Sequence, residues 1–262
     1  MSGPAARNRA PAWVRDPSCY NWLMSRAFVG EPRRGRLRCK PEPDPVLPTV
    51  RSAKRLAVGA ALVAASAALG ASVSHGARAD WVDQVALRWL PADGASTGYV
   101  WLTRIGSPPV LLGGLVAAVA MAAILKGSRR AAASVAGPIV AVLISDLIAK
   151  PIIDRQLVSG HFAYPSGTEV AVAAVAMALV LAAPARGRWY ASTVAVAACV
   201  GVGVGVVGLR WHYPTDVIGG TLLGSGCVLI VDAVFHLVGP RHRHSGVLGV
   251  EGPDPRLTAA AK

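Results

Sequence analysis

Six long apolar runs are the feature that most limits what this chain can fold into. They cover residues 56–74, 108–125, 131–149, 166–184, 189–209 and 217–238. Each is close to the ~20 residues that a helix needs to cross the hydrocarbon core of a membrane. The runs consist mainly of Ala, Val, Leu and Gly, and such small residues let neighbouring helices pack closely. The sequence therefore predicts an all-α fold, an integral membrane bundle of six transmembrane helices.

The chain has a net charge of +13, and its Lys and Arg residues are concentrated in certain segments. Of the 27 Lys and Arg residues, 21 lie in residues 1–55, near 126–130, near 186–188 or after residue 239. These segments share one side if six helices alternate, and cytoplasmic loops carry the excess of Lys and Arg. We therefore expect a multi-pass protein of the cytoplasmic (inner) cell membrane with both termini in the cytoplasm. An excess of Lys and Arg that is concentrated in the loops on one side of a membrane does not indicate nucleic acid as a partner.

The two ends of the chain differ in composition from its apolar part. Residues 1–55 are rich in Arg and contain eight Pro before position 50, a composition that cannot bury a core. We predict a disordered basic cytoplasmic tail at 1–55, a six-helix domain at 56–239 and a cytoplasmic C-terminal tail at 240–262.

A short amphipathic stretch separates the first two runs. Its apolar side chains recur at helical spacing: Trp81, Val82, Val85, Ala86, Trp89 and Leu90. Asp83, Gln84 and Arg88 lie off this stripe. The pattern predicts a helix that lies on the outer membrane surface and anchors the bundle there.

Almost all of the polar chemistry expected at the outer surface falls in three short segments: KPIIDR (150–155), YPSGTE (164–169) and RWHYPTD (210–216). Each segment alone has a structural explanation. Lys150 can pair with Asp146 one helical turn earlier, and Ser166 with Glu169 matches the capping box of a helix start. Asp216 can likewise cap the last helix.

Together, the three segments offer the parts of a phosphate site. Lys150, Arg155 and Arg210 supply cations, and a Ser-Gly helix start supplies backbone N–H groups that point at an anion. His212 and Asp216 are separated by a turn that contains a proline. This turn allows the carboxylate to hold one ring nitrogen and leave the other facing the phosphorus, as in an activated nucleophile.

With these motifs the sequence resembles the type 2 phosphatidic acid phosphatases, which share a helical core with lipid phosphate phosphatases and vanadium haloperoxidases. In that family a first motif supplies Lys and Arg, a second reads Pro-Ser-Gly-His, and a third contains Ser-Arg followed by His and Asp. The resemblance implies that His212 forms a phosphohistidine and that Asp216 orients it. It also implies that Lys150, Ser166 and Gly167 bind the phosphate, and that no metal or other cofactor takes part.

The sequence departs from the family pattern in all three motifs. Thr168 stands where the family has the histidine that protonates the leaving group. The third motif has Gly205 and Val206 in place of Ser-Arg. The first motif ends in Leu157 and Val158 in place of Arg-Pro.

Residues close to these departures offer compensation. Arg210 lies four residues after Val206, hence on the same face if the helix continues, and can reach the phosphate from there. Arg155 can reach the phosphate from the loop, and we expect Thr168 to bind the phosphate as well. His161, on the short outer loop, is an alternative proton donor.

The expected activity is hydrolysis of a phosphate ester or diphosphate of a membrane lipid, at the outer face of the membrane. General-acid assistance is commonly worth ~100- to 10,000-fold, but a phosphate leaving group, whose second pKa is about 6, needs little of it. A prenyl diphosphate is therefore the preferred substrate. One alternative is a protein that binds lipid phosphate headgroups or a membrane partner without turnover. Another is a metal site built from His161, His212 and Asp216.

Overall fold

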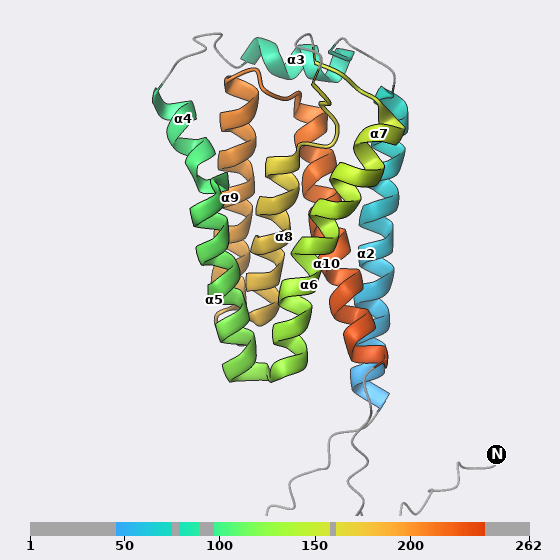
Figure 1. Cartoon of the computed structure of the whole chain (residues 1–262), viewed down its shortest axis with the longest axis vertical. Helices are drawn as coiled ribbons and strands as arrows, with labels where there is room; N and C mark the ends of the chain where they lie inside the picture. The colour runs from blue at the N-terminus through green and yellow to red at the C-terminus, as the bar shows by residue number, and fades with distance from the viewer. Residues whose placement is uncertain (1–45, 75–78, 90–96, 158–160, 239–262) are drawn as a thin grey trace, which may run out of the picture. The chain divides into compact units, whose positions relative to one another are not determined.

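The computed structural model describes residues 46–74, 79–89, 97–157 and 161–238. Residues 1–45 and the predicted C-terminal tail, 240–262, fall outside these ranges, so the disorder expected of the N-terminal tail stays a prediction there. The chain between them is all-helical in its described parts, apart from one isolated bridge between Gln156 and Phe162. The predicted all-α bundle is confirmed (Figure 1).

The elements follow one another in a simple order. The long helices are α2 (Val46–Val73), α5 (Pro108–Lys126), α6 (Ser128–Ile144), α8 (Gly167–Ala182), α9 (Arg188–Gly208) and α10 (Pro214–Val238). Shorter elements join them: α3 (Trp81–Trp89), α4 (Thr97–Thr103), the 3-10 turn η2 (Arg104–Gly106), the π-turn η3 (Ser145–Ala149) and α7 (Lys150–Ile153). All six predicted runs are therefore helical.

The number of helices long enough to span a membrane differs from the six that we predicted. Five helical stretches in the described part of the chain are long and apolar enough to cross a membrane: 50–73, 97–126, 128–153, 188–208 and 214–238. The fourth predicted run forms α8, which has only 16 residues and begins deeper in the bundle than the outer ends of α9 and α10 (Figure 1). Non-helical backbone is tolerated at such depth where protein, not lipid, surrounds it.

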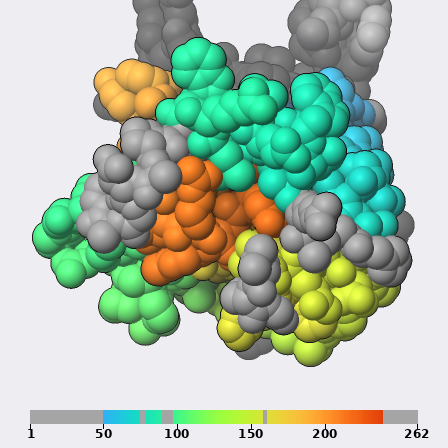
Figure 2. Space-filling model, turned by 90° about the horizontal axis from the view of Figure 1, so that it is seen from above, coloured from blue at the N-terminus to red at the C-terminus, as the bar shows by residue number. Residues whose placement is uncertain are grey.

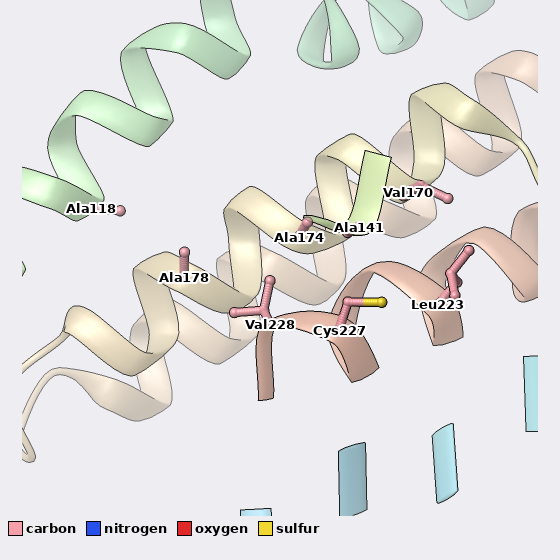
Figure 3. Packing of buried hydrophobic residues seen from close by; sticks show 8 residues of the cluster. All are labelled: Ala118, Ala141, Val170, Ala174, Ala178, Leu223, Cys227 and Val228. Carbon is pink, nitrogen blue, oxygen red and sulfur yellow. The ribbon is translucent and has the colours of Figure 1, made fainter. Parts of the chain in front are cut away.

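Helix α8 is the core of the bundle. It packs against α5, α6, α9 and α10, and Figure 3 shows Val170, Ala174 and Ala178 of α8 in one buried cluster with Leu223 and Val228 of α10. These small and branched side chains fill the interior without polar groups, as close packing requires. A short helix suffices at this place because it contacts other helices on most sides.

Helix α2 starts earlier than the sequence predicted. It begins at Val46, so residues 46–55, which we assigned to the tail, are helical. Arg55 in this added part bonds to Asp232 of α10 at 2.5 Å. Further along, a Cβ on Gly59 would lie 2.8 Å from the carbonyl oxygen of Gly226, so glycine permits this close approach of α2 and α10.

The two ends of the bundle differ in charge. The start of α2, the end of α10, the α5 to α6 turn and the α8 to α9 turn all lie at one end (Figure 1). Lys126, Arg129, Arg130, Arg186 and Arg188 lie in or next to those turns. The three polar segments lie at the opposite end, which we call the outer end.

Candidate active site

The three predicted segments meet at the outer end of the bundle. The main chain of Ser166 donates to the Asp216 carbonyl at 3.1 Å, and Ala163 donates to the Arg155 carbonyl at 2.7 Å. Buried Tyr164 fixes the middle segment to α2, because its hydroxyl donates to the Ser66 carbonyl at 2.5 Å. Burial raises the pKa of this phenol above its usual value, so it stays a donor. Figure 2 shows the α9 to α10 connection, in orange, at this end.

The His212 ring is held by a carbonyl group. Nδ1 lies 3.0 Å from the Ala163 carbonyl oxygen and 3.8 Å from Oδ2 of Asp216. A carbonyl only accepts hydrogen bonds, so Nδ1 carries the proton and Nε2 keeps its lone pair. We expected the Asp216 carboxylate to bond to this ring, but 3.8 Å is too long for a hydrogen bond. The carboxylate thus lies near the ring without a hydrogen bond to it.

Asp216 is buried and has two other partners. Its Oδ1 accepts a bond from Arg155 Nη1 at 2.6 Å, and its Oδ2 accepts one from the Tyr213 backbone N–H at 2.8 Å. Tyr213 directly precedes α10, so the second bond caps the helix start. The capping role that the sequence allowed for Asp216 is confirmed.

Arg155 is placed differently from what we predicted for a phosphate ligand. Its side chain is buried, and Nη2 donates to Asp83 at 2.5 Å, while Nη1 donates to Asp216 and to the Thr215 hydroxyl, both at 2.6 Å. Its guanidinium also stacks 4.4 Å from the centre of the Tyr213 ring. Two buried carboxylates therefore neutralise this cation, which is the usual condition for burying a charge.

Asp83 is a site residue that sequence reasoning missed. It is 0% exposed, and besides Arg155 it accepts bonds from the Thr215 N–H and hydroxyl, both at 3.0 Å. The apolar stripe of α3 points away from the bundle, with Trp81 71% and Trp89 83% exposed. The predicted surface helix thus buries its carboxylate. We call Asp83, Arg155, Thr215 and Asp216 the closed network.

The start of α8 has free hydrogen-bonding capacity. Ser166 precedes the helix and is buried, and its hydroxyl makes no cap bond and has no partner among the described residues. Lys150 Nζ lies only 3.1 Å from the place a Cβ on Gly167 would occupy. A positive charge therefore touches the first turn, whose N–H groups also attract anions. We call Lys150, Ser166 and Gly167 the open site.

The chain before Lys150 brings it to this position. Pro151 has no N–H to donate to the preceding turn, and the helix widens into the π-turn η3 just before it. The predicted pair of Lys150 with Asp146 is present, with 2.7 Å between Nζ and Oδ1. Both side chains are partly exposed, so the ammonium remains accessible to an anion.

The predicted capping box is absent, which corrects our interpretation of Glu169. Its Oε1 accepts a bond from the Thr221 hydroxyl of α10 at 3.0 Å, and the side chain is buried away from the helix start. The carboxylate thus does not occupy the N–H groups of the first turn. Thr168 points elsewhere, because its methyl group would lie 2.5 Å from a Cβ on Gly106 of η2.

Arg210 does not lie on the helical face we predicted. Helix α9 ends at Gly208, and Arg210 adopts the left-handed conformation with φ 60°. The N–H groups of Arg210 and Trp211 bond back to the carbonyls of Val207 and Val206, a Schellman motif. Its guanidinium donates to the Leu87 carbonyl of α3 at 3.4 Å. Val206 itself is buried among valines, as an apolar side chain requires.

His161 is exposed, and its main-chain carbonyl accepts a bond from Leu157. None of the described contacts joins its imidazole to His212 or to the open site. Within the described ranges, no group of three His, Cys, Asp or Glu side chains is arranged to hold a metal ion. The metal-site alternative therefore has no geometric support.

Comparison with known proteins gives a structural match. No protein-family model and no curated protein matches the sequence. The structure is similar to the crystal structure of a transmembrane PAP2-type phosphatidylglycerolphosphate phosphatase from Bacillus subtilis. Sequence identity is 21% and the TM-score 0.45, over 75% of this chain and 98% of that chain. That protein is described as of the PAP2 type, that is, of the type 2 phosphatidic acid phosphatases that the motifs resemble. At this TM-score the match carries no argument about the site, which rests on its own contacts.

Proposed function

We propose that the protein is a membrane-embedded hydrolase of lipid-linked phosphate, acting through a phosphohistidine at His212. One observation carries the proposal. The His212 ring bonds to Ala163, four residues before the start of α8, where Lys150 Nζ lies close to Gly167 and the Ser166 hydroxyl has no partner among the described residues. A nucleophile and an anion site are thereby fixed to the same short segment.

The residues then divide the reaction between them. The N–H groups of the first α8 turn, the Ser166 hydroxyl and the Lys150 ammonium hold the phosphate oxygens. The Nε2 lone pair of His212 attacks the terminal phosphorus, and the bond from phosphorus to the lipid oxygen breaks with its electron pair on that oxygen. The positive charge that develops on the ring lies 3.8 Å from the buried Asp216 carboxylate.

A water molecule completes the cycle. Its oxygen attacks the phosphorus of the phosphohistidine, the P–N bond breaks with its electrons returning to Nε2, and the water proton leaves with the phosphate or into solvent. The Ala163 carbonyl keeps the proton on Nδ1 throughout. The ring therefore returns to the tautomer that can attack again.

The leaving group decides which substrate suits this site. Thr168 replaces the histidine of the family pattern, and its side chain packs toward Gly106. Exposed His161 offers no described contact to replace it. A lipid alkoxide would leave without the proton it needs, whereas a lipid phosphate is a stable leaving group near neutral pH. We therefore propose a prenyl diphosphate, cleaved to the monophosphate, as the preferred substrate.

The location follows from the charge distribution. The basic turns lie at the end opposite to His212, and cytoplasmic loops carry the excess of Lys and Arg. We place both termini in the cytoplasm and the site at the outer face of the cytoplasmic membrane.

A second candidate is a protein that binds lipid phosphate without turnover. Thr168 in the acid position and Val206 in place of the motif arginine favour it. It does not account for the His212 ring, which is held in the tautomer that a nucleophile needs. Binding alone would require only the open site.

Phosphate release by the purified protein in detergent tests the proposal, with a prenyl diphosphate and phosphatidic acid as substrates. We expect the diphosphate to be the better substrate, and His212→Ala to lower turnover more than roughly 1,000-fold. His236→Ala, at the opposite end of the bundle, is the matched control. Release that survives His212→Ala would remove this residue from the mechanism. Binding of both lipids without any release would favour the second candidate.

A further inference from the structure

A long groove runs along one side of the bundle between α8, α9 and α10. Helix α9 packs against α8 and α4 but touches α10 only slightly, which leaves a groove of about 580 Å³ between the two. Most of its lining residues are Ala, Val, Gly, Leu, Ile and Met, and the others are Ser192, Cys199, Pro214, Thr221 and Ser225. Thr221, a polar exception, has its hydroxyl bonded to Glu169 and to the Val217 carbonyl. The groove therefore suits an apolar occupant.

The position of the groove connects it with the site. Its outer end is lined by Ala86, Val207 and Pro214, and Pro214 follows His212 by two residues. Its other end reaches Ser192 on α9 and Val180 on α8, near the basic end of the bundle. An occupant of the groove would thus have one end at the outer end of the bundle, where the proposed nucleophile also lies, and the other deep in the membrane.

The length and lining of the groove suit a hydrocarbon chain. From Ser192 to Val207 the groove follows α9 for roughly 22 Å, at 1.5 Å per residue. Its walls on α9 and α10 belong to two helical stretches that are long and apolar enough to cross a membrane. An extended hydrocarbon chain needs no polar partner along such a lining.

We propose that this groove binds the hydrocarbon chain of the phosphate-bearing substrate, an inference that rests on the proposed function. Transfer of a chain from lipid into an apolar groove brings little hydrophobic gain, because the lipid is equally apolar. The gain is orientation. A chain laid along α9 directs its headgroup to the outer end, where His212 and the open site lie, and correct placement of a reacting group is worth large rate factors. The groove makes the enzyme selective for chain length.

A blocked groove tests this inference. Ala195 lines the groove, whereas Ala197 on the same helix is exposed and does not. We expect Ala195→Phe to lower kcat/KM for geranylgeranyl diphosphate about tenfold and to leave dimethylallyl diphosphate, which is too short to fill the groove, within about twofold. Ala197→Phe should change neither substrate. An equal loss for both substrates, or equal effects of both variants, would overturn the proposal.

Photolabelling separates this inference from the proposed function. A geranylgeranyl diphosphate analogue with a diazirine at the end of its chain is bound to wild type and to His212→Ala, and the labelled residues are mapped. Labels on the inner half of α9 or α10 that excess unlabelled diphosphate removes support the groove, even if no hydrolysis occurs. Hydrolysis combined with labels elsewhere, or labelling that phospholipid alone competes away, would overturn the groove and leave the hydrolase proposal intact.

Discussion

The closed network and the open site lie at the same end of the bundle, yet they use their polar groups in opposite ways. In the closed network Arg155 joins two carboxylates through both Nη atoms, and all four residues are at most 3% exposed. In the open site a partly exposed ammonium lies beside a helix start. Among the described residues, the buried Ser166 hydroxyl has no partner, and in the closed network only Arg155 Nε lacks one. Buried charges need partners for stability. In a ligand site, by contrast, some polar groups form their hydrogen bonds only when the ligand binds. We therefore propose a positioning role for the first cluster and phosphate binding for the second.

Removal of Asp83 should have the largest effect on stability. Asp83→Ala leaves Arg155 buried with one carboxylate and leaves the Thr215 N–H without its acceptor. Loss of one partner from a buried ion pair costs about 3–5 kcal/mol of unfolding free energy. Chemical unfolding in detergent measures this cost. Asp83→Asn keeps an acceptor for Thr215 and should retain part of the stability. If Asp83→Ala unfolds like wild type, the closed network does not hold the site together.

Lys150→Met should show the reverse pattern. The Lys150 pair with Asp146 is partly exposed, so its loss should cost less than about 1 kcal/mol of stability. Loss of a cation that holds the transferring phosphate should lower kcat about 100- to 1,000-fold, as for other preorganised charges. Initial rates and unfolding midpoints measured on the same preparation separate the two effects. A variant that keeps full turnover would show that the open site does not bind the reacting phosphate.

Gly167→Ala should disturb the open site more gently. The new methyl group would lie 3.1 Å from Lys150 Nζ and 3.8 Å from Asp146 Oδ1, so the ammonium must move away from the helix start. We expect kcat/KM to fall about tenfold, since small displacements of a binding group cost rate. Gly113→Ala on α5 is the matched control, because nothing lies within 4 Å of its added methyl group. Similar losses in both variants would point to a general effect of alanine on the fold.

Much of the fold and the meeting of the three segments could be predicted from the sequence. Long apolar runs specify helices directly, and alternation of helices decides which turns share an end. The pairing of Asp146 with Lys150 depends only on helical spacing within one element. The helices and the ion pair each depend on one segment, and the end at which the three segments meet depends only on the order of the helices.

The features we missed depend on contacts between distant segments. Asp83 and Arg155 are 72 residues apart, and the stripe on α3 gives no sign of which face turns inward. Helical periodicity shows that α3 has two faces but not which face is buried. The face with Asp83 is buried because the buried Arg155 charge requires a second carboxylate, while Trp81 stays exposed. Glu169 bonds to Thr221 for a similar reason, because α10 offers a hydroxyl close to it. Such choices belong to the assembled bundle.

We expect the smallest effect at Arg210. A substitution there distinguishes a structural role of this residue from a phosphate-binding one. Its φ of 60° costs an L-residue about 1–2 kcal/mol, and glycine adopts this conformation without that cost. Arg210→Gly should therefore raise the unfolding free energy by about 0.5 kcal/mol, after the greater entropy of glycine in the unfolded chain is subtracted. Because the guanidinium points to Leu87 of α3, turnover should stay within about threefold of wild type. A loss of 100-fold or more, with stability maintained, would show that Arg210 leaves Leu87 to bind the phosphate, and the open site would then extend to the α9 to α10 turn.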